Sequence, residues 1–478
     1  MSLADLALEL TDSIVDFLHD DPTSLKALST TCRRFLPACR FHLFSEIALE
    51  SEKLRGKEFP TALAPLVKRV RLSPGSPTTG SFMAPPFLTF GSFVVPPPPL
   101  TGPQLRQCIN NIHSPHVEFK GVKVSTNHSL FTAVTTSDLK RSATSLSLND
   151  CCVDSEDLVT LCYALPRVES LRLSAITFDK SRAMIRKVER TAPVPIGFFV
   201  PSTTSTSDWS SFSESLTSTI KTRRLHLKEI VLEGTKWTNE LCEGLVGLVE
   251  RIDEATELTL RAQLPVVPSR SFDDVHGENP TGQDLIGEQL ELFTRFLEIC
   301  GAKIDRLDVC LGNGAVHNRP STKPNKLLPA QVESENRTDD RAVVQNVDSD
   351  VGLTIDTCLG SVLEHCPRLE ALRLSGSLCS THMMEQVIQG IKPISGHPPS
   401  LRVLGLGPVG AGILWNDVAH VLGFTGVGAG LERVVITEGD LRVIPVDARC
   451  VTLEKFDELR GKGVDVVISE HRRVGDLL

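Results

Sequence analysis

The chain has few aromatic residues, no excess of positive charge and no long apolar run. Only 5% of its 478 residues are aromatic, and acidic side chains outnumber basic ones, which gives a formal net charge of −9. A negative chain is poorly suited to the phosphate backbone, so we expect no nucleic-acid partner. No apolar run reaches the roughly 18 residues that span a bilayer, and the N-terminus lacks a signal peptide's positive charge. We therefore expect a cytoplasmic or nuclear protein without a membrane partner.

Motifs of cofactor and metal chemistry are also missing. The 13 cysteines form no C-x-x-C pair, and the sequence contains no H-E-x-x-H, G-x-S-x-G or Walker motif. We expect no catalytic residue, no metal and no cofactor. One alternative stays open, because Gly405-x-Gly407-x-x-Gly410 lies between a predicted strand and a predicted helix, as in NAD(P)- or FAD-binding enzymes. Too few residues follow this motif to complete such a sheet, so we favour a structural turn.

The segment 3–50 is dense in helix formers and contains no glycine. Leu10, Ile14, Phe17 and Leu18 recur at the spacing of one helix face and predict an apolar stripe on a first helix. A domain this small leaves much of its surface exposed. We therefore expect part of the stripe to contact a partner.

Two further helices are predicted in the same segment. Asp21 followed by Pro22 is typical of a helix start, because the carboxylate caps free N–H groups and proline needs no donor there. A third helix is predicted from about Thr31 toward Phe44. We expect Pro37 to break or bend it.

This segment resembles an F-box. The family's Leu-Pro-x-Glu-Leu opening, central Ile, Phe-Leu pair and Cys-Arg-Arg-Phe element have counterparts in Leu6–Leu10, Ile14, Phe17-Leu18 and Cys32–Phe35. Ala7 stands where the family has proline. The resemblance implies binding to a Skp-family adaptor, and through it to a cullin. The adaptor contacts that it implies are Leu6, Leu10, Ile14, Leu18 and Leu25.

The rest of the chain repeats one phrase. LPRVESLRLS at 165–174 returns as CPRLEALRLS at 366–375. The phrase is a helix that closes in an L-x-x-L-x-L strand, and it recurs at 158–173, 240–260, 285–309, 355–374, 382–406 and 413–436, with further strands at 146–148, 230–232 and 466–468. The last four strands end at Leu374, Leu406, Ile436 and Ile468, about 30 residues apart.

This phrase resembles the leucine-rich repeat. The resemblance implies an α/β fold in which the three-helix F-box precedes an irregular leucine-rich-repeat solenoid, with parallel strands on the concave side and helices on the convex side. The predicted divisions are an F-box-like module at 3–50, a proline-rich linker with room for a first strand at 51–103, and the solenoid at 104–478, with inserts near 203–218, 265–281 and 312–350.

The predicted strands also predict a binding surface. In each L-x-L strand the two aliphatic residues point into the core, so the middle residue faces solvent. The middle residues include Arg172, Thr259, Asp308 and Arg373, which we predict to contact a protein substrate. The leading hypothesis is a non-catalytic substrate receptor of an SCF-type ubiquitin ligase, acting in ubiquitin-dependent protein catabolism. The alternative is a protein-binding scaffold with no ligase role, which Ala7 favours.

Overall fold

The computed structural model describes most of the chain, in segments. The contacts between its residues divide the chain into two compact units. The first consists of 1–231 and 243–256, and the second of 232–242 and 257–478. Leu6, Gly410 and the predicted inserts, apart from Gly312, lie outside the described residues. The described segments are 7–50, 59–73, 102–124, 129–178, 224–264, 282–312, 362–376, 379–390, 401–409, 413, 415–423, 430–437 and 446–469.

The first unit opens with the three predicted helices, α1 (Leu8–Phe17), α2 (Pro22–Thr31) and α3 (Leu36–Ser45). The predicted start of α2 is confirmed, since the Asp21 carboxylate accepts the N–H groups of Thr23 and Ser24 at 3.0 and 3.2 Å. The predicted start of the third helix near Thr31 is wrong, because Thr31 ends α2 and α3 begins at Leu36. The expected break at Pro37 is also wrong. Pro37 lies in the first turn of α3, where its missing N–H costs no hydrogen bond.

A parallel sheet follows directly. Its strands in the first unit lie in the order β1 (Glu46–Glu50), β2 (Arg69–Ser73), β3 (His116–Lys120), β5 (Ser145–Asn149), β7 (Ser170–Ser174) and β9 (Glu229–Glu233). The connecting elements are the 3₁₀ turn η2 (Ala64–Leu66) and helices α4 (Gly102–Ile109), α5 (Ser129–Thr136), α6 (Leu139–Ser142), α7 (Ser155–Ala164) and α10 (Asn239–Val249). Both units share residues of β9 and α10.

The sheet begins earlier than the predicted domain boundary. β1 starts one residue after α3, inside the range predicted to be helical, and β2 lies inside the predicted linker. The short alternation of Ile47 and Leu49, both buried, is what makes 46–50 a strand. The helical module therefore ends at Ser45.

Four strands of the first unit lead into the same turn. Gly121, Asp150, Ala175 and Gly234 directly follow β3, β5, β7 and β9, and all have φ between 51° and 62°. After this turn come two-residue strands, β4 (Lys123–Val124), β6 (Cys152–Val153) and β8 (Thr177–Phe178), which form a second parallel sheet. A left-handed residue is unfavourable outside glycine, so its return at one position shows that the turn is part of the repeating geometry.

The second unit repeats the strand–helix order. Its parallel strands are β10 (Leu258–Leu264), β11 (Ile304–Leu311), β12 (Ala371–Gly376), β13 (Val403–Val409), β14 (Arg433–Thr437) and β15 (Asp465–Ser469). Its helices are α11 (Gly282–Cys300), the 3₁₀ turn η3 (Gly301–Lys303), α13 (Val362–His365), α14 (Thr381–Gly390), α15 (Trp415–Val421) and α17 (Val446–Gly461). The predicted strand ends Leu374, Leu406, Ile436 and Ile468 pair directly, which confirms the predicted period.

One hydrogen-bond pattern joins successive strands in both units. The carbonyl oxygens of Thr144, Glu169, Glu370 and Arg402, each just before a strand, accept two adjacent N–H groups at the start of the next strand at 2.7–3.2 Å. The two segments predicted to be one repeated unit, 165–174 and 366–375, share this pattern at Glu169 and Glu370. The sequence repeat is therefore also a structural repeat.

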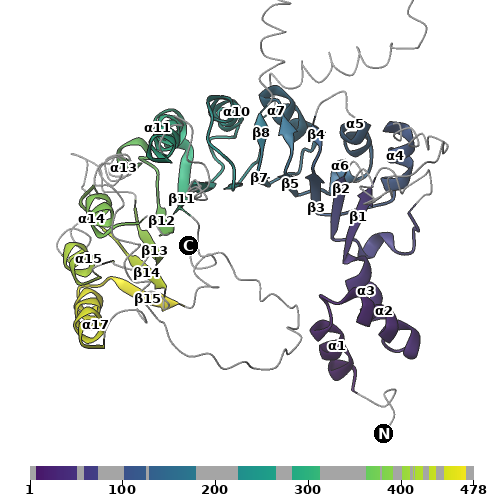
Figure 1. The fold of residues 1–478 in the computed structure, drawn as a ribbon, viewed down its shortest axis with the longest axis horizontal. Helices are drawn as coiled ribbons and strands as arrows, with labels where there is room; N and C mark the ends of the chain where they lie inside the picture. The colour runs from purple at the N-terminus through teal and green to yellow at the C-terminus, as the bar shows by residue number, and fades with distance from the viewer. Residues whose placement is uncertain are drawn as a thin grey trace, which may run out of the picture. The chain divides into compact units, whose positions relative to one another are not determined.

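In each unit the helices lie on one side of the strands (Figure 1). Strand residues alternate accordingly: in β7, Leu171 and Leu173 are fully buried while Arg172 between them is exposed. The predicted direction of the L-x-L residues is confirmed at this strand. The strand side away from the helices therefore carries the side chains that are available for binding.

Candidate functional site

The three N-terminal helices form a core of their own. Val15, Leu25, Phe35 and Cys39 are at most 1% exposed and pack together. Leu18 is partly buried against the same core. Leu25 was predicted to contact an adaptor, but the structure places it inside, because it lies on the inner face of α2. It can reach a partner only if the helices separate.

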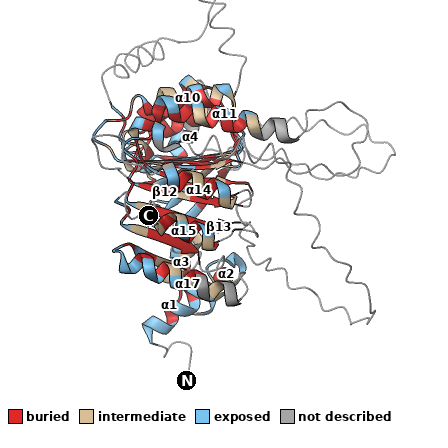
Figure 2. Cartoon of the chain, turned by 90° about the vertical axis from the view of Figure 1, so that its left-hand side faces the viewer, coloured by how far each residue is buried: buried red, intermediate tan, exposed pale blue. Residues whose placement is uncertain are grey.

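A second face of α1 stays uncovered. Thr11, Val15 and Leu18 form its inner face, at positions i, i+4 and i+7. Each of these residues is preceded by a large apolar residue, namely Leu10, Ile14 and Phe17. These three side chains are 55, 38 and 87% exposed, respectively. We call these three residues the α1 stripe. Figure 2 shows α1 mainly in the colour of exposed residues. Leu10 and Ile14 thus lie where a partner could contact them, and the contact itself stays a prediction.

A polar contact orients α1. His42 of α3 lies 2.8 Å from the Asp16 carboxylate of α1, through its Nε2 atom. The imidazole is mostly buried while the carboxylate is exposed. Together with Val15 in the core, this pair holds α1 against α3. The orientation of the α1 stripe is therefore set by the module itself.

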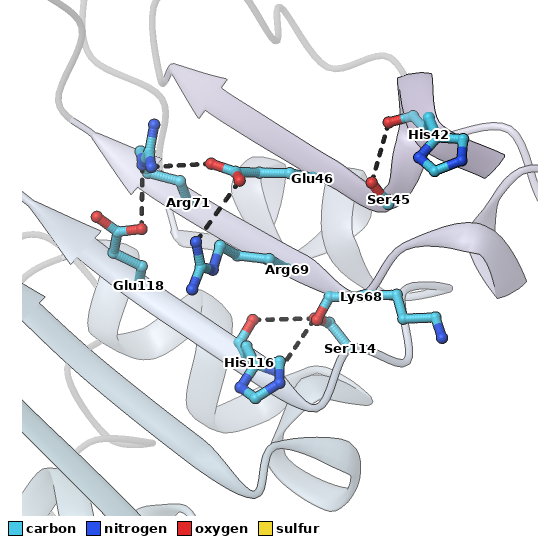
Figure 3. Close-up of polar contacts among 9 residues, drawn as sticks. All are labelled: His42, Ser45, Glu46, Lys68, Arg69, Arg71, Ser114, His116 and Glu118. Carbon is cyan, nitrogen blue, oxygen red and sulfur yellow. Dashed lines mark hydrogen bonds and ion pairs between the residues drawn. The ribbon is translucent and has the colours of Figure 1, made fainter. Parts of the chain in front are cut away.

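The helical module continues into the sheet without a linker. The Ser45 carbonyl, at the end of α3, accepts the Lys68 N–H at 2.8 Å, and the Lys68 ammonium lies 5.2 Å from the ring centre of Phe41. Ser114 Oγ lies 2.7 Å from the Lys68 carbonyl and 2.9 Å from the His116 carbonyl (Figure 3). These contacts join α3 to the first three strands.

An ion network crosses β1, β2 and β3 on the strand face (Figure 3). Glu46 pairs with Arg71 at 2.8 Å and with Arg69 at 3.6 Å, and Arg71 also bonds Glu118 at 3.1 Å. Glu118 is the most buried member, with 10% of its side chain exposed. Burial and the neighbouring Arg69 hold the pKa of His116 below its usual value. The carboxylates here are neutralised by arginine, so the network is suited to holding strands together.

Beyond this network the strand face of the first unit is polar and open. Lys120 of β3 pairs in register with Asn149 of β5, which pairs with Ser174 of β7. Ser147 and Arg172 form the row beside them. We call these five residues the β3–β7 patch. Arg172, predicted to contact substrate, lies on the β7 side of this patch and is exposed.

The predicted contact residues of the second unit mostly contact each other. Arg373 Nη1 lies 3.4 Å from Asp308 Oδ2, and its Nε and Nη2 atoms donate to the Gly407 carbonyl at 3.3 Å. Only 13 and 22% of the Arg373 and Asp308 side chains are exposed. Arg373 and Asp308 do share one row, as predicted. Their pairing makes both poor candidates for holding a partner.

Thr259 does not belong to that row. A register shift between Leu258 and Thr259 places Thr259 opposite Arg306, so that Arg261 lies opposite Asp308. The predicted alignment is therefore wrong by two residues at this strand. An irregularity of one residue in strand pairing is set by the neighbouring strand, and the L-x-L pattern alone does not reveal it.

We expect Asp308→Asn to make the stability of the second unit less dependent on pH. Burial raises the pKa of Asp308 above its ordinary 3.8, although Arg373 and Arg261 act in the opposite direction. A raised carboxyl pKa adds stability that is complete below 3.8 and is lost as pH rises through the raised value. Urea unfolding between about pH 4 and about pH 7 should show that the free energy of unfolding of the variant increases relative to that of the native chain as pH rises. If the free energy of unfolding of the variant instead decreases relative to that of the native chain, the ion pair with Arg373 outweighs the cost of burying Asp308.

The glycine motif does not form a dinucleotide-binding turn. Gly405 and Gly407 lie within β13, and Gly405 pairs with Arg373 on one side and Val435 on the other. In a nucleotide-binding unit these glycines follow the strand and open the helix. The expected strand-to-helix turn is also wrong for these two glycines. Small residues at this point instead leave room for the Arg373 side chain to reach the Gly407 carbonyl.

Within the described segments, no group of three or more His, Cys, Asp or Glu residues could hold a metal ion. Among the helices that the structure describes, none is both long and apolar enough to cross a membrane. Among the described residues, the two surfaces that we consider further are the α1 stripe and the β3–β7 patch. A scan of the chain against protein-family models and a search of curated proteins both find no match.

Proposed function

We propose that this protein is a substrate-receptor subunit of an SCF-type cullin-RING ubiquitin ligase, working in the cytoplasm or nucleus. The α1 stripe is the observation that carries the proposal. In this reading the N-terminal helices bind a Skp-family adaptor and the strand face binds the protein to be ubiquitinated. Such a receptor needs no catalytic residue, because it raises the effective concentration of a substrate lysine near the conjugating enzyme.

The α1 stripe favours a protein partner because its exposure is costly. Full burial of a side chain such as leucine or phenylalanine stabilises by about 1.5–3 kcal/mol. The module already has a complete core in Val15, Leu25, Phe35 and Cys39, so the stripe adds nothing to its folding. Three large apolar side chains on one helix side are typical of a helix that docks into an apolar groove. The F-box resemblance of the same segment makes the adaptor the natural partner.

The repeated strand–helix units support the second half of the proposal. Parallel strands, a turn that returns after four of them and helices on one side are typical of a leucine-rich-repeat solenoid. The direct junction between α3 and β1 means that the adaptor site and the strand face of the first unit share a rigid connection. A rigid connection suits a receptor, because it restricts the positions that a bound substrate can take relative to the ligase.

Wild-type protein co-expressed with a Skp-family adaptor should co-purify with it at a defined stoichiometry. The same complex, supplemented with the cullin, the RING subunit and ubiquitin, should build ubiquitin chains on proteins captured by the full-length receptor. Adaptor binding without any ubiquitination of captured proteins would favour the alternative, a scaffold that keeps an F-box-like module without ligase function.

The scaffold alternative depends on Ala7, which we expect to be a mild departure. Ala7 has φ −60° and ψ 148°, a conformation that proline adopts without strain. Ala7→Pro should therefore keep the fold and raise thermal stability slightly, by up to about 1 kcal/mol, because it restricts the unfolded chain. Calorimetric titration with the adaptor should show binding at least as tight as that of the native chain. Adaptor binding by the folded Ala7→Pro protein but not by the native chain would favour the scaffold.

A further inference from the structure

We propose that Asp16 and His42 are positioning residues of the adaptor site: they control adaptor binding through the orientation of α1, although neither belongs to the α1 stripe. This inference rests on the proposed function, which makes the α1 stripe the adaptor site, and adds two residues that act on that site through the helix. Its evidence is the narrow apolar attachment of α1, the place of Asp16 on the helix, and the contacts that fix His42.

The apolar attachment of α1 is narrow. Val15 is the residue of α1 in the four-residue core, and Leu18 packs against that core while partly exposed. Thr11, on the same inner face, is fully buried, but its Oγ1 atom bonds the Ala7 carbonyl at the start of α1 at 3.1 Å. Side chains along one line hold a helix close to its neighbours but leave it able to turn about its own axis. A contact away from that line is needed to fix this angle.

Asp16 provides a contact away from that line. Successive residues of an α-helix lie about 100° apart around its axis, so Asp16 is turned by about 100° from Val15. Counted in the same way, it lies about 100° or more from each of Leu10, Ile14 and Phe17. An adaptor can therefore cover the α1 stripe without touching Asp16, which then acts through the angle of the helix.

His42 is held firmly enough to fix that angle. Its Nε2 atom lies 2.8 Å from the Asp16 carboxylate, and only 20% of its side chain is exposed. Its ring meets the Phe41 ring edge-on, with the centres 5.3 Å apart, and its carbonyl accepts from Ser45 Oγ at 2.9 Å. A side chain that is already mostly buried loses little further freedom on forming a contact, so this pair costs less entropy than one between two mobile surface side chains.

The contacts around His42 continue into the sheet. The ring of its neighbour Phe41 lies against the Lys68 ammonium, and β2, which follows Lys68, pairs with β3 of the β3–β7 patch. The Asp16–His42 contact therefore fixes the α1 stripe relative to the strand face of the first unit as well as relative to α3. Without this contact the stripe stays intact but is presented at several angles. Adaptor binding must then also order α1, which lowers the affinity.

The test is a double-mutant cycle on the full chain, with Asp16→Ala, His42→Ala and both together, and with adaptor dissociation constants from calorimetry. Each single variant should raise the dissociation constant about twofold to fivefold, the range of a partly exposed polar pair. The double variant should bind no more weakly than the weaker single variant, because the same contact is lost in all three. Amide hydrogen exchange without adaptor should become faster in α1 and stay native in α2 and β1–β3.

Asp20→Ala is the matched control. Asp20 lies just beyond α1, 3.2 Å from His19 and 91% exposed, so this variant removes the same charge without removing the contact to α3. Its adaptor affinity and its exchange in α1 should equal those of the native chain. Unchanged adaptor affinity in both folded single variants would overturn the inference, as would effects that multiply in the double variant. Faster exchange throughout the helical module would overturn it too, because the pair would then support the whole core.

Adaptor binding by the native chain separates this inference from the proposed function. If the native chain does not bind the adaptor, the ligase proposal fails. Exchange in the variants then decides the positioning role: faster exchange confined to α1 supports it, and exchange equal to that of the native chain overturns it. Asp16→Ala is sufficient for this decision if His42→Ala does not fold, since the Asp16 side chain is 69% exposed.

Discussion

Leu10→Asp combined with Ile14→Asp is expected to abolish co-purification of the Skp-family adaptor while the receptor stays folded. Both side chains lie on the α1 stripe, and neither contributes to the core of the helical module. Losing two buried apolar contacts costs about 3–6 kcal/mol of binding free energy, and a buried unpaired carboxylate adds to that cost. A loss of this size lowers affinity by at least about a hundredfold, which titration calorimetry would register as no measurable binding.

The choice of positions separates binding from folding. Leu18 is avoided because it packs against the core, so its loss would change stability as well. Asp12→Ala, exposed on the opposite side of α1, is the matched control and should bind the adaptor as the native chain does. Leu25→Ala should lower thermal stability of the module by about 2–5 kcal/mol, which identifies it as a core residue. Full adaptor binding by a folded Leu10/Ile14 double variant would remove the basis of the ligase proposal.

Gly376→Ala is expected to destabilise the second unit strongly. Gly376 ends β12 with φ +108°, and a Cβ there would overlap the backbone of Leu311 at the end of β11. Backbone does not move aside as a flexible side chain does, so conformational strain and steric overlap add together. We expect a loss of about 3–5 kcal/mol, measured by urea unfolding and by faster amide hydrogen exchange in β11 and β12.

Gly121→Ala is the control that isolates the overlap. Gly121 also has a left-handed conformation, with φ +62°, but a Cβ there would meet no atom within 4 Å. Its cost should be limited to about 1 kcal/mol of backbone strain. If the two alanine variants lose equal stability, then β12 can shift away from Leu311 and the close packing of these strand ends is not required.

The sequence alone was sufficient for the local order of the chain. Leucine at every second position predicts a half-buried strand, and Asp21 with Pro22 predicts a helix start, because both depend on neighbouring residues only. The repeat adds longer-range information. Strands ending at Leu374, Leu406, Ile436 and Ile468 pair as their common spacing predicts. Equal repeats can stack in only one register without leaving an apolar face exposed.

The binding surfaces were decided by tertiary structure. Leu10 and Leu25 are both leucines on predicted helices, yet one is 55% exposed and the other 1%, because only the packing of α1, α2 and α3 selects the inner face. Arg172 and Arg373 occupy the same place in the repeated phrase. Arg373 is covered because Asp308 lies across from it on the neighbouring strand, whereas Arg172 has Ser147 there and stays exposed. A repeat determines where a side chain points, and the packing around it determines how far the side chain is exposed.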